Sequence, residues 1–210
     1  MKNISLIIIL IFLCGTFIIS GDEALQESLA LIEKNMEDVQ TIQAGFVQTK
    51  TMAAFQQDLT LTGNLYIEKP DRFGWRVEKP LRYFLIIDGS TVRQWDEDSG
   101  EVQTVSVDDD PVFEVAFQQM TQWFYGEYHS LLDEYEITLL SAEPVSLAFE
   151  PREDNPAKHY LEKVTVTFCK DVLYLQEIYI QEKDGDSTLM KFEDAALNKP
   201  IDPGVWEFGK

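Results

Sequence analysis

Two consecutive segments of alternating apolar and polar residues constrain the fold of this chain most strongly. Leu65 and Ile67 lie two residues apart in the first segment, and Phe73, Trp75 and Val77 do the same in the second. Side chains alternate between the two faces of a β-strand, so this period indicates two strands that are each buried on one face. The apolar face of the second strand is large and aromatic. Helices, another sheet or an apolar ligand must therefore cover it.

Turn signals on either side of these segments predict an antiparallel arrangement. Lys69-Pro70-Asp71 separates the two segments, and proline, which cannot donate a ladder hydrogen bond, ends the first strand. The run 83–87 is apolar at every position, as expected for a strand that is covered on both faces. Asp88-Gly89 then predicts a hairpin turn.

Two amphipathic helices interrupt the alternation. The helix that comes later in the chain begins near Pro111, carries a broad apolar stripe over 112–124 and ends at Gly126. The first covers residues 22–39, where apolar residues recur at helical spacing: Leu25, Leu29, Ile32 and Met36.

Period-two segments continue to the C-terminus and bring the expected total to about ten to eleven antiparallel strands. A long series of antiparallel strands favours one strongly curved sheet. We therefore predict an α+β fold that is mostly β: a strongly curved antiparallel sheet, or open, incomplete β-barrel, with helices covering its concave face.

The start of the chain has the pattern of a secretory leader. Lys2 precedes an apolar stretch over 4–19, and the small residues Ser20 and Gly21 follow. This order of a basic residue, an apolar stretch and small residues is typical of a cleavable signal peptide.

We expect residues 1–21 to be a signal peptide and residues 22–210 to form one domain. A domain of that length needs no disulfide or metal to be stable. Two alternatives stay open for the leader. In the first, the leader is not cleaved and stays as a membrane anchor, although it is short for a spanning helix. In the second, Cys14 is a site of lipid attachment.

The formal net charge of −20 argues against nucleic acid as a partner, because the phosphate backbone would be repelled. The same repulsion acts toward anionic lipid surfaces. A shuttle that exposes apolar surface would benefit from this repulsion, and solubility alone is the simpler explanation.

Catalytic and metal-binding patterns are absent from the sequence. His129 and His159 lie in different expected elements, and no nucleophile elbow, glycine-rich phosphate loop or zinc spacing occurs. Asp108-Asp109-Asp110 offers carboxylates to a divalent cation, but EF-hand spacing is missing, and a solvated helix start explains the run as well. We expect a protein that is not an enzyme and needs no cofactor or metal.

The apolar side chains of the strands and of the second helix are of the kind that line a ligand cavity. Ligand pockets have mostly aromatic and aliphatic walls with few polar groups. An ordinary packed core is the alternative for each residue taken singly. The residues that we expect around the cavity are Leu65, Ile67, Phe73, Trp75, Val77, Phe84, Ile86, Phe113, Phe117, Met120 and Trp123.

Short motifs in the first half of the mature chain follow a characteristic order behind the leader. They are Phe46-x-Gln48, Gly63-x-Leu65, Lys69-Pro70-Asp71, Phe73-x-Trp75, Pro80 and Asp88-Gly89. In this order and spacing they resemble the LolA family of periplasmic lipoprotein carriers. The second half of the chain resembles that family only in its general strand pattern.

The resemblance implies a periplasmic carrier, which we expect to be a monomer. Such a carrier takes the acyl chains of lipoproteins from an inner-membrane exporter and passes them to an outer-membrane acceptor, and no bond is broken. The helices act as a lid. In the family an arginine just before the Pro-Asp/Asn corner holds the lid, and this chain has Lys69 there, a point charge without a planar fork. Lys69 is therefore the candidate lid latch.

Two other functions stay open at this point. One keeps the fold but carries a non-lipoprotein lipid in cooperation with a lipid exporter. The other is a non-catalytic protein-binding or sensor domain that uses its sheet to bind a protein.

Overall fold

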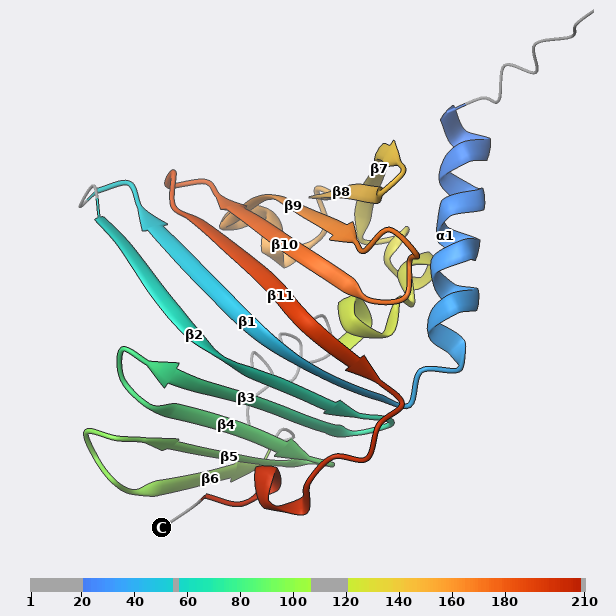
Figure 1. Cartoon of the computed structure of the whole chain (residues 1–210). Helices are drawn as coiled ribbons and strands as arrows, with labels where there is room; N and C mark the ends of the chain where they lie inside the picture. Colours follow the sequence, from blue (N-terminus) through green and yellow to red (C-terminus); the bar gives the residue numbers. More distant parts are fainter. Residues whose placement is uncertain (1–20, 55–56, 107–120, 209–210) are drawn as a thin grey trace, which may run out of the picture.

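A computed structural model describes residues 21–54, 57–106 and 121–208 (Figure 1). Within these ranges, eleven antiparallel strands form one strongly curved, open sheet, which confirms the expected mostly-β fold. The first six strands are β1 (Thr41–Met52), β2 (Gln57–Glu68), β3 (Arg72–Lys79), β4 (Tyr83–Asp88), β5 (Thr91–Asp96) and β6 (Val102–Ser106). The others are β7 (Tyr135–Ala142), β8 (Val145–Pro151), β9 (Leu161–Phe168), β10 (Leu175–Glu182) and β11 (Ser187–Leu197).

The first and last strands pair at the centre of the sheet. Its order is β6-β5-β4-β3-β2-β1-β11-β10-β9-β8-β7. Strands β1 to β6 follow one another outward, the chain then reaches the opposite edge at β7, and β7 to β11 return to the centre. The β1–β11 ladder therefore places residues far apart in sequence, such as Gln48 and Met190, directly opposite each other.

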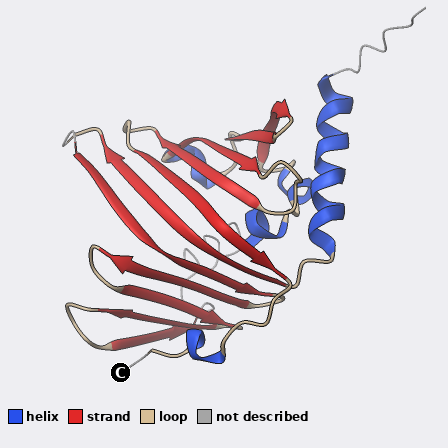
Figure 2. Ribbon diagram, viewed as in Figure 1, coloured by secondary structure: helices blue, strands red, loops and turns tan. Residues whose placement is uncertain are grey.

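Helix α1 and the helical segments that follow residue 121 lie beside one another on one side of the sheet (Figure 2). Helix α1 (Gly21–Glu37) confirms the helix expected over 22–39 and buries the predicted stripe. Residues 121–125 are also helical, and Gly126 follows with a φ of +76°, a value that glycine adopts readily at a helix end. Pro111 lies outside the described residues. Short 3₁₀ helices are η2 (Tyr128–Leu131), η3 (Pro156–His159) and η4 (Pro203–Trp206).

The inner, concave face of the sheet carries most of the apolar core. In the β2–β3 ladder, Leu65 lies opposite Trp75 and Ile67 lies opposite Phe73, so the apolar residues of the two alternating segments share one face of the sheet. Phe46 on β1 stacks on the Trp75 ring, with 3.7 Å between ring centroids. The inner faces of β1, β2 and β3 are thus joined by aromatic packing.

Gly63 allows this close packing between β1, β2 and β3. An added Cβ at Gly63 would overlap the Arg76 carbonyl oxygen and would lie 2.9 Å from Cζ of Phe46. Any side chain would displace either the neighbouring strand or the aromatic ring. Glycine at this position is therefore a packing requirement of the curved sheet.

The outer face of β3–β5 is covered by the C-terminal segment. In the β3–β4 ladder, Phe84 lies opposite Arg76 and Ile86 lies opposite Gly74, so both point away from the face that carries Trp75. The sequence-based assignment of Phe84 and Ile86 to the cavity is therefore corrected. The strand is apolar on both faces, so its sequence did not reveal which residues point inward.

Candidate functional site

An apolar cavity of about 490 Å³ lies against the inner face of the sheet, beside the helical segment 121–125. Strands from both halves of the chain contribute to it, because β1 and β11 pair at the centre. The residues that border the cavity are Gln48, Phe73, Trp75, Leu85, Trp123, Phe124, Ile178, Ile180, Thr188 and Met190. Eight of these ten side chains are aromatic or aliphatic, which is the composition expected for a site that holds an apolar ligand.

Aromatic contacts hold the walls of the cavity in place. The rings of Phe73 and Trp75 are parallel, with centroids 6.5 Å apart, and Phe124 packs on Phe73 at 6.3 Å. Phe192 on β11 contacts both Trp75 and Phe124 edge-on. Such geometries are favourable beyond the area that they bury, so the wall is preorganised.

Trp123 is fixed from two sides. Its ring stacks on Phe149 at a centroid distance of 5.9 Å, and its backbone carbonyl accepts a 2.8 Å hydrogen bond from the hydroxyl of Tyr128. Tyr128 is fully buried, and this burial raises the pKa of its phenol far above the ordinary value. The neutral hydroxyl therefore stays available as a donor at every physiological pH.

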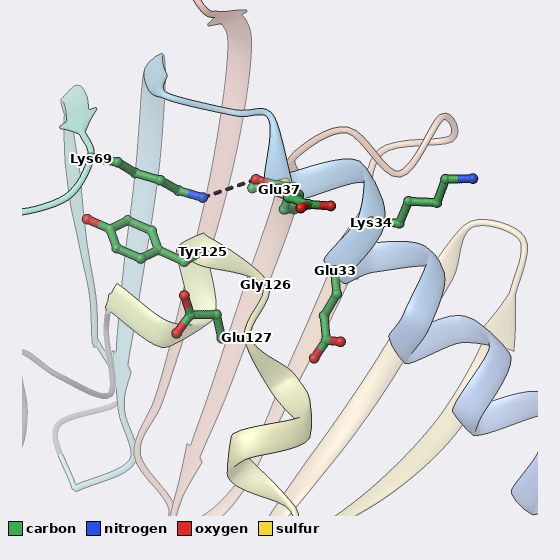
Figure 3. A pocket seen from close by; sticks show the side chains of 8 residues that line it. Glu33, Lys34, Glu37, Lys69, Tyr125, Gly126 and Glu127 are labelled. Atoms are coloured by element: carbon green, nitrogen blue, oxygen red, sulfur yellow. Dashed lines mark hydrogen bonds between the residues drawn. The ribbon is translucent and has the colours of Figure 1, made fainter.

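Lys69 connects the sheet to the C-terminal end of α1. Its Nζ donates a 3.0 Å hydrogen bond to the carbonyl oxygen of Met36, and Figure 3 shows this bond beside the ring of Tyr125. The last carbonyls of a helix lack partners within the helix and favour a cation. Burial lowers the pKa of Lys69, and the charge of Glu127 opposes this effect.

A second, more polar pocket of about 370 Å³ surrounds this contact (Figure 3). Lys69 lies 4.9 Å from the centroid of the Tyr125 ring, and the Tyr125 hydroxyl donates to the carbonyl oxygen of Pro70 at 3.0 Å. Burial raises the pKa of Tyr125 to about 12. The residues around the pocket are Glu33, Lys34, Met36, Glu37, Lys69, Tyr125, Gly126 and Glu127.

Other polar contacts of α1 involve partly exposed side chains. Glu33 contacts Nδ1 of His129 at 2.6 Å, and the Asn35 amide donates to the carbonyl oxygen of Val172 at 3.2 Å. Exposed pairs of this kind contribute little free energy. The apolar stripe of α1 and the Lys69 contact therefore carry most of its attachment.

The structure brings together only part of the predicted cavity set. Phe73, Trp75 and Trp123 border the cavity. Leu65, Ile67 and Val77 lie on the same face but are buried in the core cluster instead. Phe113, Phe117 and Met120 lie outside the described residues.

Several cavity residues were missed because they come from the second half of the chain. Ile178, Ile180 and Met190 lie on β10 and β11, whose alternation was visible in the sequence but not connected with β3. The β1–β11 pairing brings β10 and β11 next to the first half of the sheet, and no local sequence pattern predicts this pairing. Leu85 was missed for a different reason, since its strand is apolar on both faces.

Residues 21–54, 57–106 and 121–208 contain no group of three or more histidine, cysteine, aspartate or glutamate side chains that could hold a metal ion. His129 is engaged with α1, and Asp108-Asp109-Asp110 lies outside these ranges. No helix in the described part of the chain is long and apolar enough to cross a membrane.

An open, curved sheet with an apolar cavity on its inner face is an architecture suited to a carrier of apolar cargo. The family described as outer membrane lipoprotein carrier protein LolA matches residues 37–209. The chain therefore belongs to the LolA family. Membership in a family of carriers also agrees with the expectation of a binding protein rather than an enzyme.

Similar proteins span nearly the same length. Over 177 residues the chain is 25% identical to an outer-membrane lipoprotein carrier protein of Alkalilimnicola ehrlichii, covering 82% of this chain and 75% of the relative. A carrier protein of the same description from Legionella pneumophila strain Corby is 23% identical over 208 residues, covering 99% and 95%.

Two solved structures share the fold. An uncharacterized conserved protein from Thermus thermophilus has a TM-score of 0.56 at 11% identity, covering 89% of this chain and 95% of the other. Lipoprotein LppX of Mycobacterium tuberculosis has a TM-score of 0.50 at 12% identity, covering 86% and 98%. At such identities the likeness concerns the fold alone.

Proposed function

We propose that this protein is a periplasmic carrier that binds the acyl chains of lipoproteins in its inner cavity. It takes them from an inner-membrane exporter and delivers them to an outer-membrane acceptor. The observation that carries this proposal is the apolar cavity of about 490 Å³ in a chain of the LolA family. The volume falls within the range of ordinary ligand pockets.

The free energy of burying hydrocarbon is sufficient for transport through water. Each buried methylene contributes about 0.8 kcal/mol, so a chain of about sixteen carbons gains roughly 13 kcal/mol before ordering costs. Carriage therefore requires only that the cavity accept the chain. No covalent step is needed.

Release requires that the cavity open. We infer that α1 and the helical segment 121–125 act as the lid, with Lys69 as its latch on the Met36 carbonyl. A lysine makes this contact through a single ammonium, whereas an arginine would offer a fork of donors. Opening therefore costs one charge-assisted hydrogen bond plus the apolar contacts of α1, and a partner that binds the open form shifts the equilibrium.

Export is the part of the proposal that depends on the leader. Residues 1–21 would direct the chain across the inner membrane and be removed, which leaves residues 22–210 in the periplasm. Intact-mass measurement of protein purified from periplasmic extract tests this. A mass that includes the leader, or a lipid on Cys14, would contradict removal.

Lipid extraction tests the cargo directly. Protein from its native periplasm is extracted with organic solvent, and the extract and bound peptides are analysed by mass spectrometry. Acylated lipoprotein peptides are the expected result. A non-lipoprotein lipid would point to a different cargo for the same fold, and the absence of any lipid from freshly purified protein would count against a carrier.

A further inference from the structure

The inner face of the sheet changes from apolar to polar along three neighbouring strands, and always toward the same end. The paired registers of β1 with β11 and of β11 with β10 align these changes side by side. The series are Phe46, Gln48 and Lys50 on β1; Phe192, Met190, Thr188 and the adjoining Asp186 on β11; and Ile178, Ile180 and Glu182 on β10.

The polar end lies far from the lid latch. β1 begins beside Lys69, whose backbone amide donates to the carbonyl oxygen of Gln40 at 2.9 Å. Lys50 lies roughly 30 Å further along, at about 3.3 Å per residue. In Figure 1 the C-terminal end of β1 and the β10–β11 hairpin lie at the same end of the strands. The inner face therefore has an apolar end near the latch and a polar end at the hairpins.

Gln48 and Thr188 are the polar side chains that border the cavity. Within the ranges that the structure describes, neither side chain makes a hydrogen bond, although Thr188 is only 8% exposed. Polar groups beside apolar walls lose part of their hydration and therefore gain free energy from a hydrogen-bonding partner. A ligand with oxygen acceptors beside its hydrocarbon chain would satisfy them.

The charges next to these two residues indicate which acceptors fit. Lys50 Nζ forms an ion pair with Glu182 and lies 3.5 Å from Oδ2 of Asp186, so the three groups carry one net negative charge. The hydrogen bond with Glu182 is the main cause that raises the pKa of Lys50, so the ammonium stays charged. A neutral ester or amide fits beside this group better than a carboxylate does.

We propose that Gln48 and Thr188 recognise the carbonyl oxygens of neutral acyl esters or acyl amides. The bound lipid then lies with its chain ends toward Phe46 and its head toward Lys50. This inference rests on the proposed carrier function and adds the chemical class and the orientation of the cargo. The same carbonyl chemistry occurs in acylated lipoproteins and in acylglycerols.

Binding of three probes of similar length tests the recognition site: methyl palmitate, palmitate and heptadecane. Wild type is compared with the double variant Gln48→Leu, Thr188→Val. The control is Thr49→Val, Gln181→Leu, which changes the same residue types on the outer faces of β1 and β10. Loss of the two hydrogen bonds should weaken methyl palmitate binding about tenfold in the cavity variant, with heptadecane changed less than about twofold.

The possible outcomes distinguish failure of the recognition site from failure of the proposed carrier function. Wild type should prefer methyl palmitate over palmitate, and the control variant should behave like wild type. Unchanged methyl palmitate binding in a folded cavity variant, or a preference for palmitate, would overturn the recognition site and leave the carrier intact. If wild type binds no probe, both proposals fail.

Photocrosslinking tests the orientation and does not depend on variants. Palmitoyl esters carry a diazirine either beside the carbonyl or at the chain end, and the labelled peptides are mapped. The carbonyl-proximal probe should label residues near Lys50, and the terminal probe should label residues near Phe46. The reverse pattern would overturn the proposed orientation. Competition with the ester probe distinguishes acylated lipoproteins from acylglycerols as the natural source of the carbonyl group. An acylated lipoprotein peptide should displace the probe more effectively than an acylglycerol.

Discussion

The two faces of β3 are both rich in aromatic contacts, yet the pockets beside them differ in chemistry. On the inner face, Phe73 and Trp75 pack on neighbouring rings and still leave about 490 Å³ beside them. On the outer face, the C-terminal segment packs against the strand with Trp206 directly over Gly74, and the pocket of about 420 Å³ that remains there is bordered mainly by charged side chains and Trp206. Aromatic content alone therefore does not distinguish a binding site from a packed surface.

Arginine side chains complete the outer face. Arg76 donates to the carbonyl oxygens of Val205 at 2.6 Å and Glu207 at 3.3 Å, and Arg93 donates to the Trp206 carbonyl at 3.1 Å. Arg72 lies over the Trp206 ring at 4.3 Å. Four of the five arginines of this acidic chain are in β3–β5 or between these strands. The C-terminal segment thus binds the arginines of the outer face and leaves a charged pocket there, whereas the cavity on the inner face is lined mainly by apolar side chains.

The largest expected effect comes from placing a charge on the inner face. Trp75→Glu should weaken binding of a fluorescent fatty-acyl probe by about a hundredfold, because an unpaired carboxylate would have to be desolvated beside hydrocarbon. Fluorescence titration measures this effect. Trp95→Glu, the same change on the outer face, is the control and should keep near wild-type affinity. Equal loss in both folded variants would remove the distinction between the faces.

Removing the outer tryptophan should affect stability instead of binding. Trp206→Ala should lower the free energy of unfolding by about 3 kcal/mol, as for other large aromatic deletions. Urea denaturation followed by circular dichroism measures the change. Probe affinity of the folded variant should stay within about twofold of wild type, and a large loss of affinity would mean that the two faces are coupled.

The latch should control release. Lys69→Met removes the ammonium that donates to the Met36 carbonyl and should speed probe dissociation about tenfold, because hydrogen bonds of charged donors are the stronger ones. Lys69→Arg should slow dissociation by restoring a fork of donors. Stopped-flow displacement measures both rates. Identical rates in the three proteins would show that α1 does not gate the cavity.

The smallest expected effect compares added volume on the two faces. Gly74→Ala places a methyl group 3.2 Å from Cζ3 of Trp206 and should cost about 1 kcal/mol of stability. Leu85→Phe adds volume toward the cavity and should change stability by less than about 0.5 kcal/mol while reducing probe affinity. Denaturation and titration of both variants sharpen the comparison. A stability loss for Leu85→Phe as large as that for Gly74→Ala would indicate that the inner space is already filled.

Local patterns predicted much of this architecture. The alternation around Trp75 placed Leu65 and Ile67 on its face, and helical spacing predicted α1 and its buried stripe. The position of Lys69 before the proline corner also pointed to the residue that contacts the end of α1. Such features depend on a few neighbouring residues, so the spacing of the apolar residues and the identity of the turn residues are sufficient to predict them.

The sequence by itself determined the mostly-β fold, the amphipathic first helix and the aromatic face of β3, because side-chain direction follows from backbone period. Only the tertiary structure decided that β11 pairs with β1, which brings Ile178 and Met190 to the cavity. It also decided that Phe84 points outward, where its ring packs against Trp95 and Arg76. Long-range pairing and the choice between two apolar faces depend on what packs against each face, and that is a property of the whole chain.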